Sequence, residues 1–144
     1  MGEAKVTRDD RGRIVIPSEH YHAFEDAPDV LIGPAPSGES LYVFPPSAWN
    51  SLVDRLREGK EGDDPEAPAF LRLYTSLYRR EKVQGKSRRI DLTPDLSALA
   101  SLSDNVVVVG RDDRLEVMDE STWRRRIADI LATVKPLAEK SRWD

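Results

Sequence analysis

The sequence predicts an α+β fold built from two tandem copies of one unit, each made of short strands, a hairpin and a helix. Strand-like segments and a tryptophan occur twice, in the same order and at a nearly constant spacing. The matched pieces are residues 13–16 with 89–92, 29–32 with 105–108, 41–44 with 115–118, and Trp49 with Trp123. Segments that recur in this way indicate an internal duplication.

The stretch at residues 9–17 is the most informative part of the first copy. Asp9 and Gly12 fit the first and fourth positions of a type I turn. Three β-branched residues follow and Pro17 ends the strand. In an extended strand Asp9 and Arg13 would lie roughly 13 Å apart, whereas a turn can bring the carboxylate beside the guanidinium. The carboxylate would then fix one rotamer of Arg13 and leave other donors free. An ordinary surface ion pair is the alternative.

The other elements of the first copy follow from its apolar pattern. Residues 5–8 are expected to form a short strand. Residues 30–32 and 41–44 are expected to form buried, paired strands, because Pro, Ser and Gly between them signal a hairpin. A helix follows, with Ser47 as a candidate N-cap. Apolar residues at i, i+3, i+4 and i+7 predict one buried face, with Trp49 as a core anchor. They are Trp49, Leu52, Val53 and Leu56.

Ser18 is a candidate N-cap for a short helix that extends to about residue 27. This helix would contain His20 and His22, whose spacing places the two rings on different faces. No third ligand is evident nearby. Ordinary surface or half-buried histidines are therefore favoured over a metal site, and no cofactor is predicted.

The middle of the chain is expected to connect the two repeats. Residues 58–69 are rich in Gly, Pro and acids without the spacing of a calcium loop, and so predict a solvated linker. Residues 70–77 predict a helix that docks aromatic and leucine side chains onto the core. The expected boundaries are 5–57 for the first repeat, 58–78 for the connector and 79–134 for the second repeat with its C-terminal helix.

The second copy keeps the arginine of the turn but not the acid. At the spacing that aligns the first strands of the two copies, the correspondences are Arg89 with Arg13, Gly85 with Asp9, and Arg88 with Gly12. Thr93 is a candidate N-cap, with Pro94 in the first helical turn. The last helix carries an apolar stripe, and Pro136 is expected to bend or end it. The stripe consists of Ile127, Ile130, Leu131 and Val134.

Composition limits the classes of function. The 144 residues suit one compact domain or two halves that share a core. Charged residues make up 33% and the mean hydropathy is −0.55. No apolar run approaches the roughly 20 residues of a membrane span, and the chain does not begin with an apolar signal segment, so a cytoplasmic protein is expected. The absence of cysteine excludes disulfides and thiolate chemistry. No catalytic constellation emerges, and an enzyme is not predicted.

Charge is unevenly distributed along the chain. The net charge is −4 and the pI about 5.3, which alone would argue against nucleic acid. Residues 79–89, however, carry six basic side chains against Glu81 alone, and acids concentrate at 58–66. Since the local field governs steering, a nucleic-acid surface remains open.

These features together resemble the MraZ family of transcriptional regulators. The most specific matches are Asp9-x-x-Gly12-Arg13-x-x-Ile16-Pro17, the paired tryptophans and Phe70-x-Arg72, within a resemblance that covers about residues 5–130. The resemblance implies two tandem SpoVT/AbrB-like repeats. They would form swapped-hairpin β-barrel halves in a pseudo-dimer with flanking α-helices.

The resemblance also implies a function and an assembly. Members form rings of several chains and bind short direct repeats in double-stranded DNA upstream of their own operon in the division and cell-wall cluster. Such a protein would be cytoplasmic and associated with the nucleoid. Asp9 and Arg13 carry over as the DNA-contacting pair. In the second repeat only Arg89 does, because Gly85 and Arg88 depart from the pattern.

The leading hypothesis is a sequence-specific DNA-binding repressor. Arg13 would read a guanine edge or bind a phosphate, oriented by Asp9, while other cations bind the backbone. The candidate contact residues are Asp9, Arg11, Arg13, Lys86, Arg88 and Arg89. The alternative is an AbrB-like oligomeric protein-interaction module that has lost specific DNA readout, as the altered second turn and the acidic pI suggest.

Overall fold

The computed structural model describes residues 3–17, 24, 27–58 and 67–141. The expected helix at 18–27, with His20 and His22, and the acidic segment 59–66 lie almost wholly outside the described residues. In chain order the elements are β1 (Glu3–Thr7), β2 (Arg13–Val15), β3 (Asp29–Pro34), β4 (Ser40–Phe44), α1 (Pro46–Glu58), α2 (Ala67–Ser76), β5 (Arg79–Lys82), β6 (Arg89–Asp91), α3 (Pro94–Leu99), β7 (Asn105–Gly110), β8 (Leu115–Asp119) and α4 (Glu120–Ser141).

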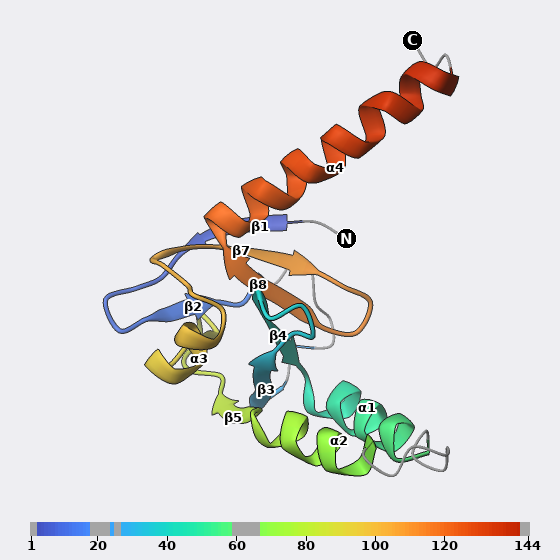
Figure 1. The fold of residues 1–144 in the computed structure, drawn as a ribbon. Coiled ribbons are helices and arrows are strands. Elements are labelled where there is room, and N and C mark those ends of the chain that lie inside the picture. Colours follow the sequence, from blue (N-terminus) through green and yellow to red (C-terminus); the bar gives the residue numbers. More distant parts are fainter. Residues whose placement is uncertain (1–2, 18–23, 25–26, 59–66, 142–144) are drawn as a thin grey trace.

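The fold is α+β, as predicted, and its strands are antiparallel (Figure 1). Six strands form one sheet in the order β1-β7-β8-β4-β3-β5, and β2 pairs with β6 in a separate two-stranded ribbon. The first strand of each repeat pairs with the third strand of the other, β1 with β7 and β5 with β3. The two repeats therefore share one sheet.

Matched strands of the two repeats also pair with each other. In the ribbon, Ile14 lies opposite Ile90, its counterpart in the aligned repeats. In the middle of the large sheet, Tyr42 of β4 lies opposite Glu116 of β8, again a matched pair. Because the pairing is antiparallel, the turn that precedes β2 lies beside the end of β6, and the turn that precedes β6 lies beside the end of β2.

The main core lies between the ribbon and one face of the large sheet. Alternate residues of the paired strands point into it, as strand periodicity requires. The fully buried side chains come from both repeats, and include Ile14, Val30, Ile32, Leu41, Val43, Ile90, Val106, Val108, Leu115 and Val117. Neither repeat could enclose this core alone.

A smaller aromatic cluster covers the other face of the sheet beneath α1. Trp49 is half-buried and packs against Tyr78 and Phe44, with ring centroids 4.5 and 5.7 Å away, so it anchors α1 to this cluster although α1 has no fully buried residue. Tyr78 lies directly over Gly33 of β3. A Cβ atom at Gly33 would lie 2.4 Å from the Tyr78 ring, so only glycine fits there.

Helix starts were predicted with mixed success. The Thr93 hydroxyl accepts a hydrogen bond from the backbone N–H of Leu96 at 3.3 Å, which confirms Thr93 as the N-cap of α3. The prediction for Ser47 was wrong, because α1 begins at Pro46 and places Ser47 in its first turn. Proline favours this first position, where its missing N–H costs nothing.

The predicted docking of aromatic and leucine side chains of α2 onto the core holds for Tyr74, which packs against the aromatic cluster, but not for Phe70 and Leu73. Phe70 and Leu73 are 63% and 67% exposed. Trp49 and Tyr78 already cover the sheet there. Among described residues of α2, Tyr74 makes the polar contact to the sheet, donating its hydroxyl to the Pro34 carbonyl at 2.5 Å.

Helix α4 continues through Pro136 to Ser141, so the proline does not end it. The helix extends away from the sheet (Figure 1), and the stripe residues Ile130 and Leu131 are 56% and 62% exposed. Water can satisfy the carbonyl that loses its partner at such an exposed proline. Asp119 caps the start of the helix through the Ser121 N–H and hydroxyl, at 3.1 and 2.5 Å.

Gly33→Ala tests the close approach of Tyr78. The new methyl group would overlap the ring, and overpacking of this kind costs about 1–3 kcal/mol. We expect urea denaturation to show a loss of that size. In a Tyr78→Leu background the same substitution should cost much less, and an equal cost in both backgrounds would contradict the steric explanation.

Candidate nucleic-acid interface

The first turn is held together by the Asp9 side chain. The Gly12 N–H donates to the Asp9 carbonyl at 2.9 Å, which closes the turn. Oδ1 of Asp9 accepts the backbone N–H groups of Arg11 and Arg13 at 2.9 and 2.8 Å. One carboxylate oxygen thereby holds the turn backbone, and the other is left to accept from side chains.

The predicted pair between Asp9 and Arg13 is formed. Nε of Arg13 donates to Oδ2 of Asp9 at 2.8 Å, and the two side chains are 20% and 19% exposed. The backbone N–H of Arg13 is the main cause that lowers the pKa of Asp9 to about 2. Partial burial opposes this shift, while the Arg11 N–H and the Arg13 side chain add to it. The carboxylate is therefore ionised at neutral pH.

The second turn differs from its expected alignment by one residue. The N–H of Gln84 donates to the Arg89 carbonyl at 2.7 Å, as the N–H of Asp9 does to the Arg13 carbonyl at 2.9 Å. Gln84, rather than Gly85, thus occupies the position of Asp9, and the earlier correspondence was wrong. The second loop contains one more residue, which a fixed spacing cannot detect.

The two turns contact each other through their side chains. Nη1 of Arg13 donates to Oε1 of Gln84 at 2.9 Å. Nη1 of Arg89 donates to Oδ2 of Asp9 at 3.1 Å. Each arginine therefore contacts the residue at the start of the opposite turn. Gln84 is the functional candidate that sequence reasoning missed, and an alignment that allowed one inserted residue in the second loop could have found it.

Arg88 does not face outward as a backbone-binding side chain would. Its Nη2 donates to the main-chain carbonyls of Phe24 and Ala27, the latter at 2.9 Å. Its φ of +57° is the left-handed conformation that its counterpart Gly12 adopts at +79°. These hydrogen bonds stabilise a conformation that disfavours residues with a Cβ. The structure thus gives Arg88 a structural role, and its predicted contact with DNA stays a prediction.

In the first repeat, Arg8 supplies the corresponding guanidinium. It donates to the carbonyls of Leu92 and Ser103, at 2.9 and 3.4 Å, and to the Ser97 hydroxyl at 2.8 Å. Ser103 is the counterpart of Ala27 in the aligned repeats. A Cβ atom at Gly12 would lie 2.8 Å from Nη2 of Arg8, so a larger residue at position 12 would displace this guanidinium.

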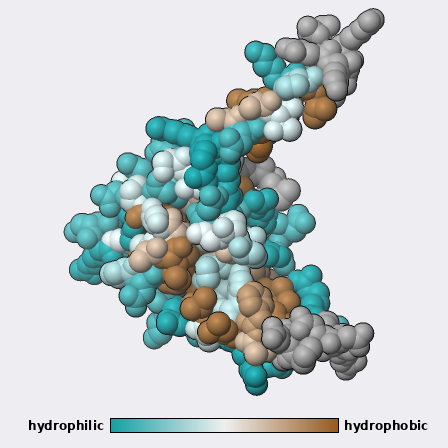
Figure 2. Space-filling view, in the orientation of Figure 1, coloured by the Kyte–Doolittle hydropathy of each residue, from teal (hydrophilic) through white to brown (hydrophobic). Residues whose placement is uncertain are grey.

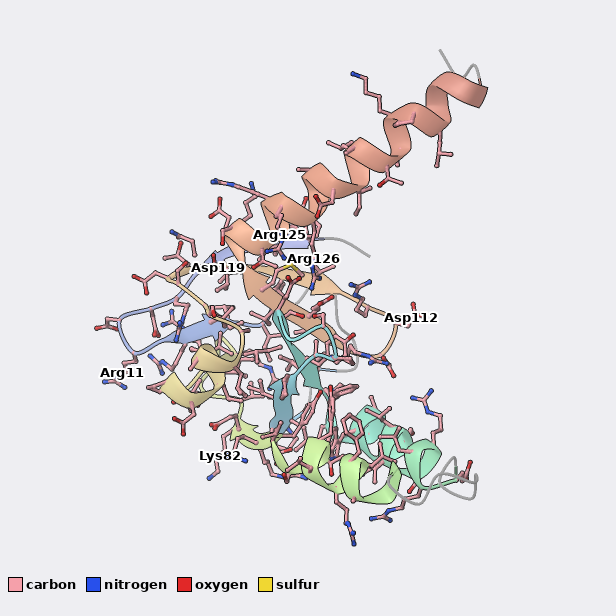
Figure 3. All side chains as sticks on the ribbon, viewed as in Figure 1. Arg11, Lys82, Asp112, Asp119, Arg125 and Arg126 are labelled. Carbon is pink, nitrogen blue, oxygen red and sulfur yellow. The ribbon has the colours of Figure 1, made fainter. Side chains whose placement is uncertain are left out.

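The remaining predicted cations surround the paired turns. Arg11 and Lys86 are exposed, and neither side chain has a hydrogen bond or ion pair within the described residues. Arg11 points outward from the loop between β1 and β2 (Figure 3). The Arg89 side chain is 38% exposed. Arg11, Arg13, Lys86 and Arg89 therefore form a cationic surface around Asp9, which we call the paired-turn surface.

Comparisons with known proteins give a consistent family. No protein-family model matches the chain. A protein of Thermus thermophilus named transcriptional regulator MraZ is 32% identical over 143 residues, which cover 98% of this chain and 94% of that protein. The chain belongs to the MraZ family. MraZ proteins of Deinococcus radiodurans and Carboxydothermus hydrogenoformans are 32% and 29% identical, over 92% and 97% of this chain and 89% and 94% of their own.

The names of these MraZ relatives describe regulators and not enzymes. In the part of the chain that the structure describes, no group of three or more His, Asp or Glu side chains is placed to hold a metal. No described helix is long and apolar enough to cross a membrane.

The depressed pKa of Asp9 predicts a pH-dependent contribution to stability. The pKa is about 2 in the folded chain against an ordinary 3.8, so the stabilisation is complete above 3.8 and is lost as the pH falls toward 2. Asp9→Asn should reduce the free energy of unfolding at pH 5, and the difference from the unsubstituted protein should shrink toward pH 2. Urea denaturation across this range measures it.

Asp10→Asn is the matched control, because Asp10 is exposed and forms no ion pair among the described residues. Its denaturation curves should follow those of the unsubstituted protein. Asp119, whose pKa is also lowered to about 2, is intact in every variant and cancels in the comparison. A constant difference between Asp9→Asn and the unsubstituted protein from pH 5 to pH 2 would contradict the assignment.

The inward position of Arg88 predicts a loss of stability on substitution. Arg88→Ala removes a charged donor from two carbonyls and should lower the free energy of unfolding by about 1–3 kcal/mol. Lys86→Ala, in the same loop, should change it by less than about 0.5 kcal/mol. Thermal and urea denaturation distinguish them. Unchanged stability of Arg88→Ala would restore its predicted role as a surface cation.

Proposed function

We propose that this chain is a sequence-specific DNA-binding transcriptional repressor that contacts the duplex through its paired-turn surface. The observation that supports this most directly is the guanidinium of Arg13, held at two nitrogens beside the exposed cations Arg11 and Lys86. The naming of its MraZ relatives as transcriptional regulators agrees with this proposal.

The proposed division of labour follows from how firmly each side chain is held. An arginine fixed in one orientation suits a guanine edge, where a bidentate contact is worth roughly 1–3 kcal/mol in discrimination. Side chains without fixed partners, such as Arg11 and Lys86, suit phosphates, which position a protein without specifying sequence. Arg89 is intermediate, because it has one fixed partner, Asp9, and is partly exposed. Arg88 is left out of the proposed contact set because its Nη2 donates to two main-chain carbonyls and holds the side chain against the first repeat.

The finer architecture and setting belong to the same proposal. Residues 5–57 and 79–134 would be SpoVT/AbrB-like repeats joined by a connector at 58–78, forming swapped-hairpin β-barrel halves in a pseudo-dimer. The chains would assemble into a homo-oligomeric ring on short direct repeats upstream of their own division and cell-wall operon, in the cytoplasm and associated with the nucleoid. A ring multiplies weak contacts through effective concentration.

A second candidate function is an oligomeric protein-interaction module without specific DNA readout. It is favoured by an apolar groove of about 450 Å³ between α1 and α2, lined by Leu52, Phe70 and Leu77 among others. Hydrophobic residues gather on the surface around these helices (Figure 2). Exposed apolar patches of this kind mark interaction sites.

Arg13→Ala and Lys86→Ala test the proposed function together. The first variant should lose the preference for DNA from upstream of the protein's own gene over a scrambled duplex, by roughly tenfold. The second should weaken binding to both duplexes equally and reduce the slope of log affinity against log salt by about one. Fluorescence anisotropy over a salt series measures both quantities.

The outcomes separate the two candidate functions. Equal losses on both duplexes for both variants would refute the division between reading and positioning. An intact oligomer that binds every duplex alike, or none at low salt, would favour the interaction module.

A further inference from the structure

We propose that Gln84 is a positioning residue that sets the sequence specificity of Arg13 from the opposite repeat, an inference that rests on the proposed function. Gln84 belongs to the second turn, whereas Arg13 follows the first. They meet because β2 and β6 pair in the ribbon.

Two acceptors define the orientation of the Arg13 guanidinium. Asp9 accepts from Nε at 2.8 Å and Gln84 accepts from Nη1 at 2.9 Å. One contact would let the planar group swing about the ion pair, but contacts at two nitrogens fix its plane. Within the described residues Nη2 has no partner. The guanidinium therefore keeps Nη2 and the second N–H of Nη1 as free donors in a fixed plane, and a bidentate contact to a base would use these two nitrogens.

The second repeat lacks an equivalent arrangement. Arg89 reaches Asp9 through Nη1 at 3.1 Å, and its buried Nε has no hydrogen-bond partner in the described structure. The acid that holds Nε of Arg13 is replaced in the second turn by Gln84, which turns its carbonyl toward Arg13 instead. Gln84 thus improves the orientation of Arg13 and leaves Arg89 more loosely held. A chain built this way has one reading arginine and contacts DNA with a defined polarity.

The neutrality of the amide also matters for a DNA surface. Glutamate at residue 84 would accept the same hydrogen bond from Arg13 but would add a second negative charge beside Asp9. With Gln84, the group formed by Asp9, Arg13, Gln84 and Arg89 keeps a formal net charge of +1. The amide NH2 group has no partner among the described residues and remains a donor on an exposed side chain.

The test compares Gln84→Ala with Gln84→Glu and with Ser87→Ala, an exposed neutral change in the same loop. Each variant of the full chain is titrated with the upstream and scrambled duplexes over a salt series. Gln84→Ala should lower the preference for the upstream duplex about fivefold to tenfold, the effect of one hydrogen bond. Its salt slope should not change, because no charge is removed. Gln84→Glu should weaken binding to both duplexes and keep the preference, and Ser87→Ala should match the unsubstituted protein.

A second measurement examines, without DNA, whether Gln84 and Asp9 fix the orientation of the Arg13 guanidinium. In 15N spectra of the free protein, the Nη groups of Arg13 should give separate signals in the unsubstituted chain and in Gln84→Glu, and averaged signals in Gln84→Ala. Retained preference in Gln84→Ala would overturn the role of Gln84 alone. An unsubstituted protein that binds both duplexes equally would overturn the proposed function and the specificity role together. The spectra would then still decide whether Gln84 orients Arg13.

Discussion

The antiparallel pairing of β2 with β6 is the constraint on which the rest of the structure depends. It places Ile14 opposite Ile90 and closes the main core with one strand from each repeat. Because β2 and β6 pair over only three residues, side chains from the two ends of the ribbon are within hydrogen-bond distance of one another. The cluster of Asp9, Arg13, Gln84 and Arg89 exists only because the repeats are interleaved. Fold stability and the arrangement of the paired-turn surface therefore depend on one set of contacts.

The two repeats place a guanidinium at matched positions, but the arginine that supplies it comes from a different position in each repeat. A guanidinium donates to matched carbonyls in each repeat, at Ser103 in one and Ala27 in the other. It comes from Arg8 in the first and from Arg88 in the second. Where Arg8 supplies it, the turn residue is Gly12, which has a φ of +79° and lies directly beside the guanidinium. In the second repeat Val83 follows β5 where Arg8 follows β1, and the turn residue Arg88 itself carries the guanidinium. An arginine at the end of a turn is thus insufficient grounds for a DNA contact.

Local sequence spacing predicted much of this fold, but it failed where contacts between distant residues determine the role or exposure of a side chain. The strands and the pair between Asp9 and Arg13 lie within a few residues of their determinants, so the sequence was enough. The role of Gln84 depends on a partner 71 residues away and on one additional loop residue, neither visible in a repeat aligned at constant spacing. Phe70 is exposed because Trp49 and Tyr78 cover the sheet in its place. The apolar periodicity of the helix cannot reveal this competition.

The acidic net charge of the chain is a poor guide to this surface, because many acids are neutralised where they lie. Glu116 is buried and accepts hydrogen bonds from Arg111 and Arg126, at 2.5 and 3.0 Å, and Asp29 pairs with Arg80 at 2.7 Å. Asp9 is the one acid among the contact residues proposed for DNA, and it would repel phosphate if it stood alone. Two arginines flank it, so its charge orients cations instead of opposing the ligand. Asp9 lowers the positive charge of the surface by one unit, which would weaken binding to any DNA, but it fixes the direction of the Arg13 guanidinium. In the proposed DNA-binding role that balance would favour sequence discrimination over general binding strength, which gives a reason for an acid at the centre of a cationic site.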